Sequence, residues 1–231
     1  MLFTTIFSCS KDESPNVAYD CNDNFVDTIG LKVIHDELAA ELCDSIISWR
    51  TQSLDSDTQV RLVFEDIMVN SFAQRANLNP TDVLNGYYDL GINVQTLPTW
   101  YQSSRQNFTP LQSDFMNDVE NVYLTSSTES EIHTKLDAVR GQWKCRLDIE
   151  QVESTIEIAK SSFPYWKVNT DGCIAISGTA SLRRDCGSAI AFADAWGTLT
   201  GAVTGGLPGA MLGALGGTLG SGIYHAISGG C

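Results

Sequence analysis

The chain has 231 residues, 43% of them hydrophobic, and a formal net charge of −14 at pH 7. This length supports one good core with a small appended module, and the hydrophobic share argues against wholesale disorder. The acidity argues against nucleic acid as a partner and against electrostatic attraction to anionic lipid. Nearly all of the negative charge precedes residue 187, so an acidic part is followed by an almost uncharged, apolar part.

The N-terminus carries a pattern typical of an export signal. Residues 2–9 form a short apolar run that ends in Ile6, Phe7, Ser8 and Cys9. This order resembles the lipobox of bacterial lipoproteins, and the polar residues 10–23 resemble the tether of surface lipoproteins in the Bacteroidota. The resemblance implies a signal remnant at 1–9, lipid attachment at Cys9, and anchoring at the outer membrane or cell surface. The alternative is a cytosolic N-terminus with a chance cysteine, because no basic region precedes the run.

The seven cysteines fit the same location. The sequence has no CxxC pair and its three histidines are isolated, which argues against a zinc site. Without Cys9, six cysteines remain, an even number that suits three disulfides in an oxidising compartment.

Residues 24–163 are predicted to form an acidic, all-α helical bundle. Apolar residues recur there at three- and four-residue steps, with acids between them. Helices are expected at 25–49, at 57–76 with Ser56 or Asp57 as the cap, and at 80–88, 110–124, 127–143 and 148–163. Residues 93–109, which contain Pro98, are expected to form a loop. The last helix should stop before Pro164, and residues 164–186 form a connector with one short strand at 173–177.

Several motifs resemble parts of active or metal sites but lack essential elements. Residues 55–58 match DxDxT without the buried strand that precedes a phosphoryl-transfer loop, and Asp20, Asn22 and Asn24 lack the other ligands of a calcium loop. Residues 35–37 lack the second histidine of a metalloprotease helix, and no serine sits in a GxSxG motif. We therefore expect no catalytic residue, no metal ligand and no cofactor, and a protein that is not an enzyme.

Residues 187–231 contain a regular row of glycines. They recur at intervals of four: Gly197, Gly201, Gly205, Gly209, Gly213 and Gly217. A second row of large aliphatic residues has the same spacing two positions along. Because four is close to the 3.6-residue helical turn, each row forms a stripe along a helix. Small residues in such a stripe allow close helix packing where water is scarce. A flexible tail is the alternative.

The chain is expected to reverse direction within this tail. Gly205 and Gly206 can end one helix, and Pro208 suits the first turn of the next. The result is a helical hairpin with arms at 189–205 and 208–227, rather than one long helix kinked at Pro208. Cys186 and Cys231 would meet at the open end of the hairpin, so we predict a disulfide between them.

The sequence leaves the surroundings of the hairpin open between lipid and a protein core. Each arm is about long enough to cross a ~30 Å hydrocarbon layer, but Asp194 and His225 are costly in lipid unless they are paired or near an interface. A glycine-zipper hairpin with a closing disulfide resembles part of some membrane-permeabilising bacteriocins. Tyr165, Trp166 and residues 193–197 resemble uncharacterised Bacteroidota lipoproteins with glycine-zipper tails, a family without an established activity.

Three functions follow from these patterns. The first is a lipid-anchored envelope protein whose tail associates with the lipid membrane or forms a homo-oligomer through the glycine face. The second is a bacteriocin-like, membrane-permeabilising toxin. The third is a secreted helical binding protein whose tail folds into its own core. We predict the first and keep the other two as alternatives.

Overall fold

The described part of the chain is an all-α helical bundle. The computed structural model describes residues 29–52, 54–168 and 180–218, and these contain helices and no strand. The predicted all-α class is therefore confirmed. The expected signal remnant and tether at 1–23 and the expected strand at 173–177 lie outside the described residues.

The helices follow one another closely along the chain. In order they are α1 (Ile29–Thr51), α2 (Ser56–Leu62), the π-helix η1 (Val63–Ser71), α3 (Phe72–Ala76), α4 (Pro80–Asp89), α5 (Leu97–Ser104), the short 3₁₀ helix η2 (Arg105–Asn107), α6 (Pro110–Thr125), α7 (Glu129–Trp143), α8 (Ile149–Val168) and α9 (Ala180–Gly217). The single helix expected at 57–76 is α2, η1 and α3 in direct succession, with wider π turns in the middle.

Side-chain caps explain where several helices begin. The Asp55 side chain, rather than the expected Ser56 or Asp57, accepts a hydrogen bond from the Thr58 backbone N–H at 2.9 Å. Asn79 caps α4 in the same way, and Thr109 and Gln112 form a reciprocal capping box at α6. Each cap satisfies backbone N–H groups that have no partner within the helix.

Two expected breaks at proline are helical instead. Pro98 lies in the first turn of α5, where its missing N–H costs nothing, and α5 is held by the buried side chains of Leu97 and Trp100. Pro164 lies inside α8, which continues to Val168. The turn beyond Pro164 is stabilised by Trp166, which is buried and donates its indole N–H to Asp194 at 3.0 Å. Tertiary contacts therefore outweigh the local preference of proline to end a helix.

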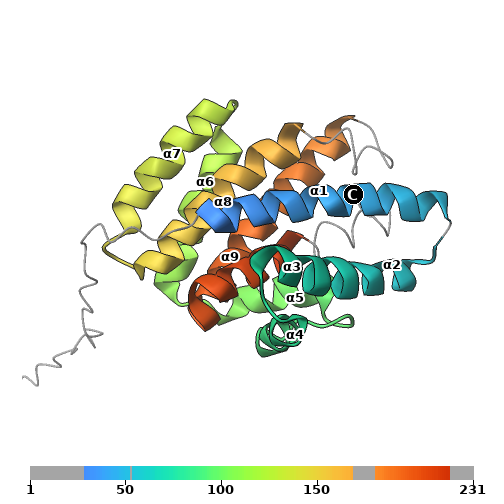
Figure 1. Ribbon diagram of the computed structural model, residues 1–231. Coiled ribbons are helices and arrows are strands. Elements are labelled where there is room, and N and C mark those ends of the chain that lie inside the picture. The colour runs from blue at the N-terminus through green and yellow to red at the C-terminus, as the bar shows by residue number, and fades with distance from the viewer. Residues whose placement is uncertain (1–28, 53, 169–179, 219–231) are drawn as a thin grey trace, which may run out of the picture.

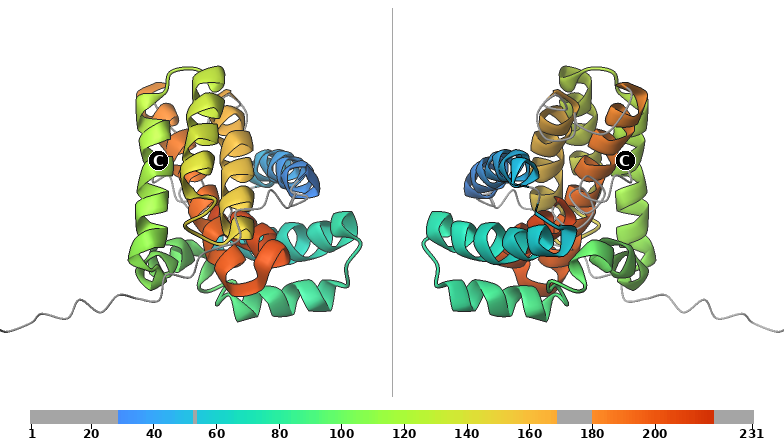
Figure 2. Two further views of the ribbon diagram at one scale, coloured as in Figure 1. Left: turned by 90° about the vertical axis from the view of Figure 1, so that its left-hand side faces the viewer. Right: turned by 90° about the vertical axis from the view of Figure 1, so that its right-hand side faces the viewer.

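Helix α9 lies at the centre of the molecule. Figures 1 and 2 show α6, α7 and α8 on one side and α2, α3 and α4 on the other, with α9 between them. It packs most extensively against α8. Leu199 and Trp196 belong to one hydrophobic cluster of the core, and Met211 and Leu215 belong to the other. The described part of the tail therefore belongs to the core of the helical domain, rather than forming a module of its own.

Candidate functional site

The two arms of α9 contact each other through bare backbone. A Cβ atom placed on Gly197 would collide with the carbonyl group of Gly213, and one on Gly201 would collide with that of Gly209, both at distances well under 3.0 Å. Gly217 meets the backbone of Ala193 in the same way. Because residue numbers increase along the first arm while those of their partners decrease along the second, the two arms run antiparallel. No larger residue fits at these positions without separating the arms.

The chain reverses at Gly205 and Gly206, the only residues of α9 with non-helical backbone angles. Gly206 has φ 61° and ψ −148°, a region that residues with a side chain rarely adopt. Pro208 follows at the start of the second arm. Gly205 differs from the other glycines of the row, because a Cβ atom added there would meet nothing within 4 Å. It lies at the bend and not in the contact between the arms.

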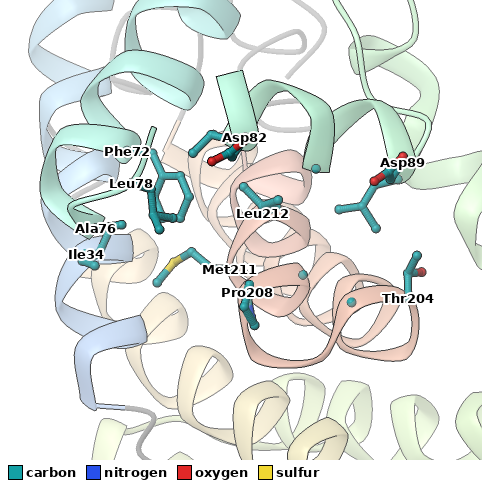
Figure 3. A pocket seen from close by; sticks show the side chains of 15 residues that line it. Ile34, Phe72, Ala76, Leu78, Asp82, Asp89, Thr204, Pro208, Met211 and Leu212 are labelled. Carbon is teal, nitrogen blue, oxygen red and sulfur yellow. The ribbon is translucent and has the colours of Figure 1, made fainter. Parts of the chain in front are cut away.

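A pocket of about 530 Å³ opens at this bend, between α9 and the α3–α4 side of the bundle (Figure 3). Its walls are mostly apolar and come from α1, α3, α4 and α9. They are formed by Ile34, Phe72, Ala76, Leu78, Asp82, Val83, Gly86, Asp89, Leu90, Thr204, Gly205, Pro208, Gly209, Met211 and Leu212. This volume is within the range of about 300–1,000 Å³ that is common for small-molecule sites. We call it the bend pocket.

A second, more polar pocket of about 360 Å³ adjoins the bend pocket. The two share Asp89, Leu90 and Thr204. The second pocket continues towards α5 and η2, where Ser103 and Asn107 line it. An elongated ligand could therefore place an apolar part at the bend and a polar part between α5 and α9.

A cluster of polar side chains is buried at the other end of the α9 hairpin. The Asp194 carboxylate is fully buried, and its Oδ2 atom lies 3.4 Å from Nε2 of His35. The Asp194 carboxylate accepts hydrogen bonds at Oδ2 from the Trp166 indole N–H, at 3.0 Å, and from the Ser162 hydroxyl. Its Oδ1 atom accepts one from the Thr218 hydroxyl. These contacts join α1, α8 and both ends of the α9 hairpin. We call these five residues, together with Asp36, the Asp194 cluster.

The cluster places a histidine between two acidic side chains. Burial alone lowers the pKa of His35, but hydrogen bonds and charge attraction from Asp194 and Asp36 outweigh it and raise the pKa to about 9. Nδ1 of His35 lies 3.2 Å from Asp36, which also accepts a hydrogen bond from the Ser161 hydroxyl. Burial raises the pKa of Asp36, but these two hydrogen bonds and the attraction of the positive charges on His35 and Lys32 together hold it below its usual value. At neutral pH a buried imidazolium thus lies between two carboxylates.

The cluster contains a hydroxyl, an imidazole and a carboxylate in contact, the components of a nucleophilic triad. The Thr218 hydroxyl lies 3.3 Å from Nε2 of His35, and Asp36 lies on the other side of the ring. A protonated imidazole cannot remove a proton from that hydroxyl, which already donates to Asp194. None of these residues lines the bend pocket or its neighbour. The arrangement is suited to holding helices together rather than to catalysis.

The predicted site residues fall into three groups. Gly197, Gly201, Gly209, Gly213 and Gly217 lie in the contact between the arms, whereas Gly205 lines the bend pocket. Cys9 and Cys231 lie outside the described residues. Cys186 lies in the described backbone of α9, but its side chain is outside the described set, so the predicted Cys186–Cys231 disulfide stays a prediction.

Sequence reasoning missed both the bend pocket and the Asp194 cluster. The sequence contained one signal for the cluster, since Asp194 is the single carboxylate of an otherwise uncharged, apolar segment. A buried charge of this kind needs a partner, but nothing in the pattern of α1 identified His35. No sequence signal marked the bend pocket, because its walls come from four separate helices.

The described residues hold no group of three or more potential metal ligands. None of the described helices combines the length and the apolar character needed to cross a membrane. Comparisons with protein-family models, with curated proteins and with solved structures found no match for this chain.

Proposed function

We propose that this protein is a non-enzymatic, extracytoplasmic binding protein that holds a small apolar ligand in the bend pocket. The observation that carries this proposal is an open, mostly apolar cavity at the bend, where the described part of the α9 hairpin reaches the surface of the bundle. Gly205 and Pro208, which line the cavity, are exposed. Apolar cavities of this size that open to solvent are the usual form of small-ligand sites.

The burial of the glycine face supports this function over membrane packing or self-assembly. Gly197, Gly201 and Gly213 are buried against the opposite arm of the same chain. A second copy, or a membrane helix, could reach this face only if the two arms separated. Separation would also expose the apolar side chains that α9 contributes to both hydrophobic clusters. The described glycine face thus has its packing partners within its own domain.

We also propose that the protein is anchored outside the cytoplasm through lipid on Cys9. The lipobox-like pattern at residues 6–9 supports this location. Cys43 and Cys145 also support this location, because neither of them is a free thiol. We infer that they are disulfide-bonded, as an oxidising compartment permits. Membrane fractionation of wild type and Cys9→Ser would test the anchor, which should resist high salt and be lost in the variant.

Binding in the bend pocket can be tested with the uncharged apolar dye Nile red. The wild-type protein should bind it saturably with increased fluorescence. Gly205→Leu should weaken binding at least tenfold, because the new side chain enters the pocket where a Cβ atom meets nothing within 4 Å. Gly141→Leu is the matched control, since Gly141 is a helical glycine in α7 that also has open space around its Cβ position. Equal binding by wild type and Gly205→Leu would refute the proposal.

The bacteriocin-like function is a second proposal, favoured by one observation. The α9 hairpin is apolar, buried, and surrounded by amphipathic helices, so its release would deliver an apolar hairpin to a membrane. Dye leakage from liposomes tests this directly with the full chain. Leakage by the wild-type protein that increases when Asp194→Asn weakens the polar cluster would favour the toxin. Intact liposomes with both proteins would count against it.

A further inference from the structure

The bend pocket carries charge of a single sign. Among the described residues that line it, the ionisable ones are Asp82 and Asp89, and both are carboxylates on α4. They are seven residues apart, which places them on the same face of the helix about 10 Å from one another along its axis. Figure 3 shows both on the α4 side of the pocket, with the side chain of Leu212 between them and the α9 bend.

Neither carboxylate has a cationic partner among the described residues. The basic residue on the neighbouring helix α3 is Arg75, and its guanidinium group is paired with Glu37 at 3.2 Å and Glu41 at 2.6 Å. Asp82 and Asp89 are both exposed. A bound cation could therefore reach either carboxylate without displacing an existing ion pair and without being fully dehydrated.

The apolar walls lie directly beside these charges. Phe72, Met211 and Leu212 line the part of the pocket between α3, α4 and the second arm of α9. Asp89 lines both pockets, so it lies at the boundary between the apolar bend pocket and the more polar second pocket. An occupant that fits this arrangement has an apolar body and a positive charge next to it. An anionic amphiphile such as a fatty acid would bring its carboxylate towards two like charges.

We propose that the ligand of the bend pocket is an apolar compound that carries a protonated amine. Its apolar part lies against Phe72, Met211 and Leu212, and its ammonium group lies between Asp82 and Asp89, attracted by both carboxylates without touching both at once. Any further polar part extends into the second pocket. This inference rests on the proposed binding function and names the chemical class of its ligand.

The experiment compares three probes with the same apolar chain and different head groups: decylammonium, decanoate and 1-decanol. Binding to the full chain is measured at neutral pH by displacement of Nile red. Decylammonium should bind at least tenfold more tightly than decanoate, with 1-decanol between them. Asp82→Asn and Asp89→Asn should each weaken decylammonium binding several-fold and leave 1-decanol binding unchanged. Asp114→Asn is the control, since it removes the same charge from an exposed position of α6 outside both pockets.

The outcomes separate the inference from the function on which it rests. If all three probes bind equally and Gly205→Leu weakens all of them, the pocket binds apolar ligands and the amine preference is wrong. If decylammonium is preferred but Asp114→Asn weakens its binding as much as Asp89→Asn does, the preference comes from the net charge of −14 and the inference is also wrong. If no probe binds, or Gly205→Leu affects none of them, the proposed function itself fails.

Discussion

The buried imidazolium of His35 makes the stability of the fold depend on pH in a defined window. Its pKa is raised from 6.5 to about 9 in the folded chain, so the folded state binds the proton more tightly than the unfolded state does. Below pH 6.5 both states are protonated and the full stabilisation is present. Between pH 6.5 and about 9 the unfolded state loses the proton first, and stability falls as pH rises.

The size of the effect follows from the shift. A difference of one pKa unit corresponds to about 1.4 kcal/mol, so a shift from 6.5 to about 9 contributes roughly 3 kcal/mol to the free energy of unfolding. That is a large share of the roughly 5–15 kcal/mol typical of a folded domain. The lowered pKa of Asp36 acts in a different window, because its stabilisation is lost only as pH falls below the usual carboxyl range.

Urea unfolding between pH 6 and pH 10 measures this contribution. The difference in unfolding free energy between the wild type and His35→Gln should shrink by about 3 kcal/mol as pH rises through this range. His133→Gln, which changes a histidine on the surface of α7, should keep the wild-type dependence on pH. If His35→Gln does not fold, the imidazole can be titrated in the wild type by NMR. A constant difference across the range, or a His35 titration near pH 6.5, would refute the assigned pairing with Asp194.

Two further predictions concern α9. Gly201→Ala should lower the free energy of unfolding by about 1–3 kcal/mol or more, because its Cβ atom meets the fixed backbone of Gly209, whereas Gly205→Ala should change it by less than about 0.5 kcal/mol. Thermal unfolding of the two variants would measure this difference, and equal losses of stability would contradict the glycine contact. Asp194→Ala should lower the free energy of unfolding by about 3–5 kcal/mol, because it leaves His35 charged, buried and without its counter-ion on α9. A decrease below about 1 kcal/mol in urea unfolding would contradict this role of Asp194.

The sequence predicted those features that depend on local periodicity. The amphipathic spacing between residues 24 and 163 indicated an all-α bundle, and most helices lie within a few residues of the predicted ranges. The four-residue glycine row indicated a helix with a bare face. Both patterns are properties of one short segment and need no knowledge of its neighbours. The same local rules failed at Pro98 and Pro164, where buried tryptophans hold helices that proline alone would discourage.

What the sequence could not provide was the set of partners for each face. A bare glycine stripe meets its partner equally well in lipid, in a second copy or in the opposite arm, because the stripe itself is the same in all three. Gly205 shares the spacing of the row but lies at the reversal, where nothing faces it within 4 Å. Its place in the row predicted that Gly205 packs against the opposite arm, but the chain reverses at this residue and it makes no such contact. The pocket that it lines depends on α1, α3 and α4, which reach it only through the tertiary fold.

The two ends of the α9 hairpin have different physical characters, and this difference explains why the proposed binding site lies at the bend. At the Asp194 end, His35 and Trp166 fix the hairpin to α1 and α8 through short polar contacts in a fully buried setting. Along the arms, backbone contact at Gly201 and Gly213 leaves no room for a side chain. At the bend neither constraint operates, and the space left between helices is open and apolar. Since a ligand can be accommodated only where packing is incomplete, the bend is the position on the described arms of α9 where the proposed binding is compatible with the stability of the fold.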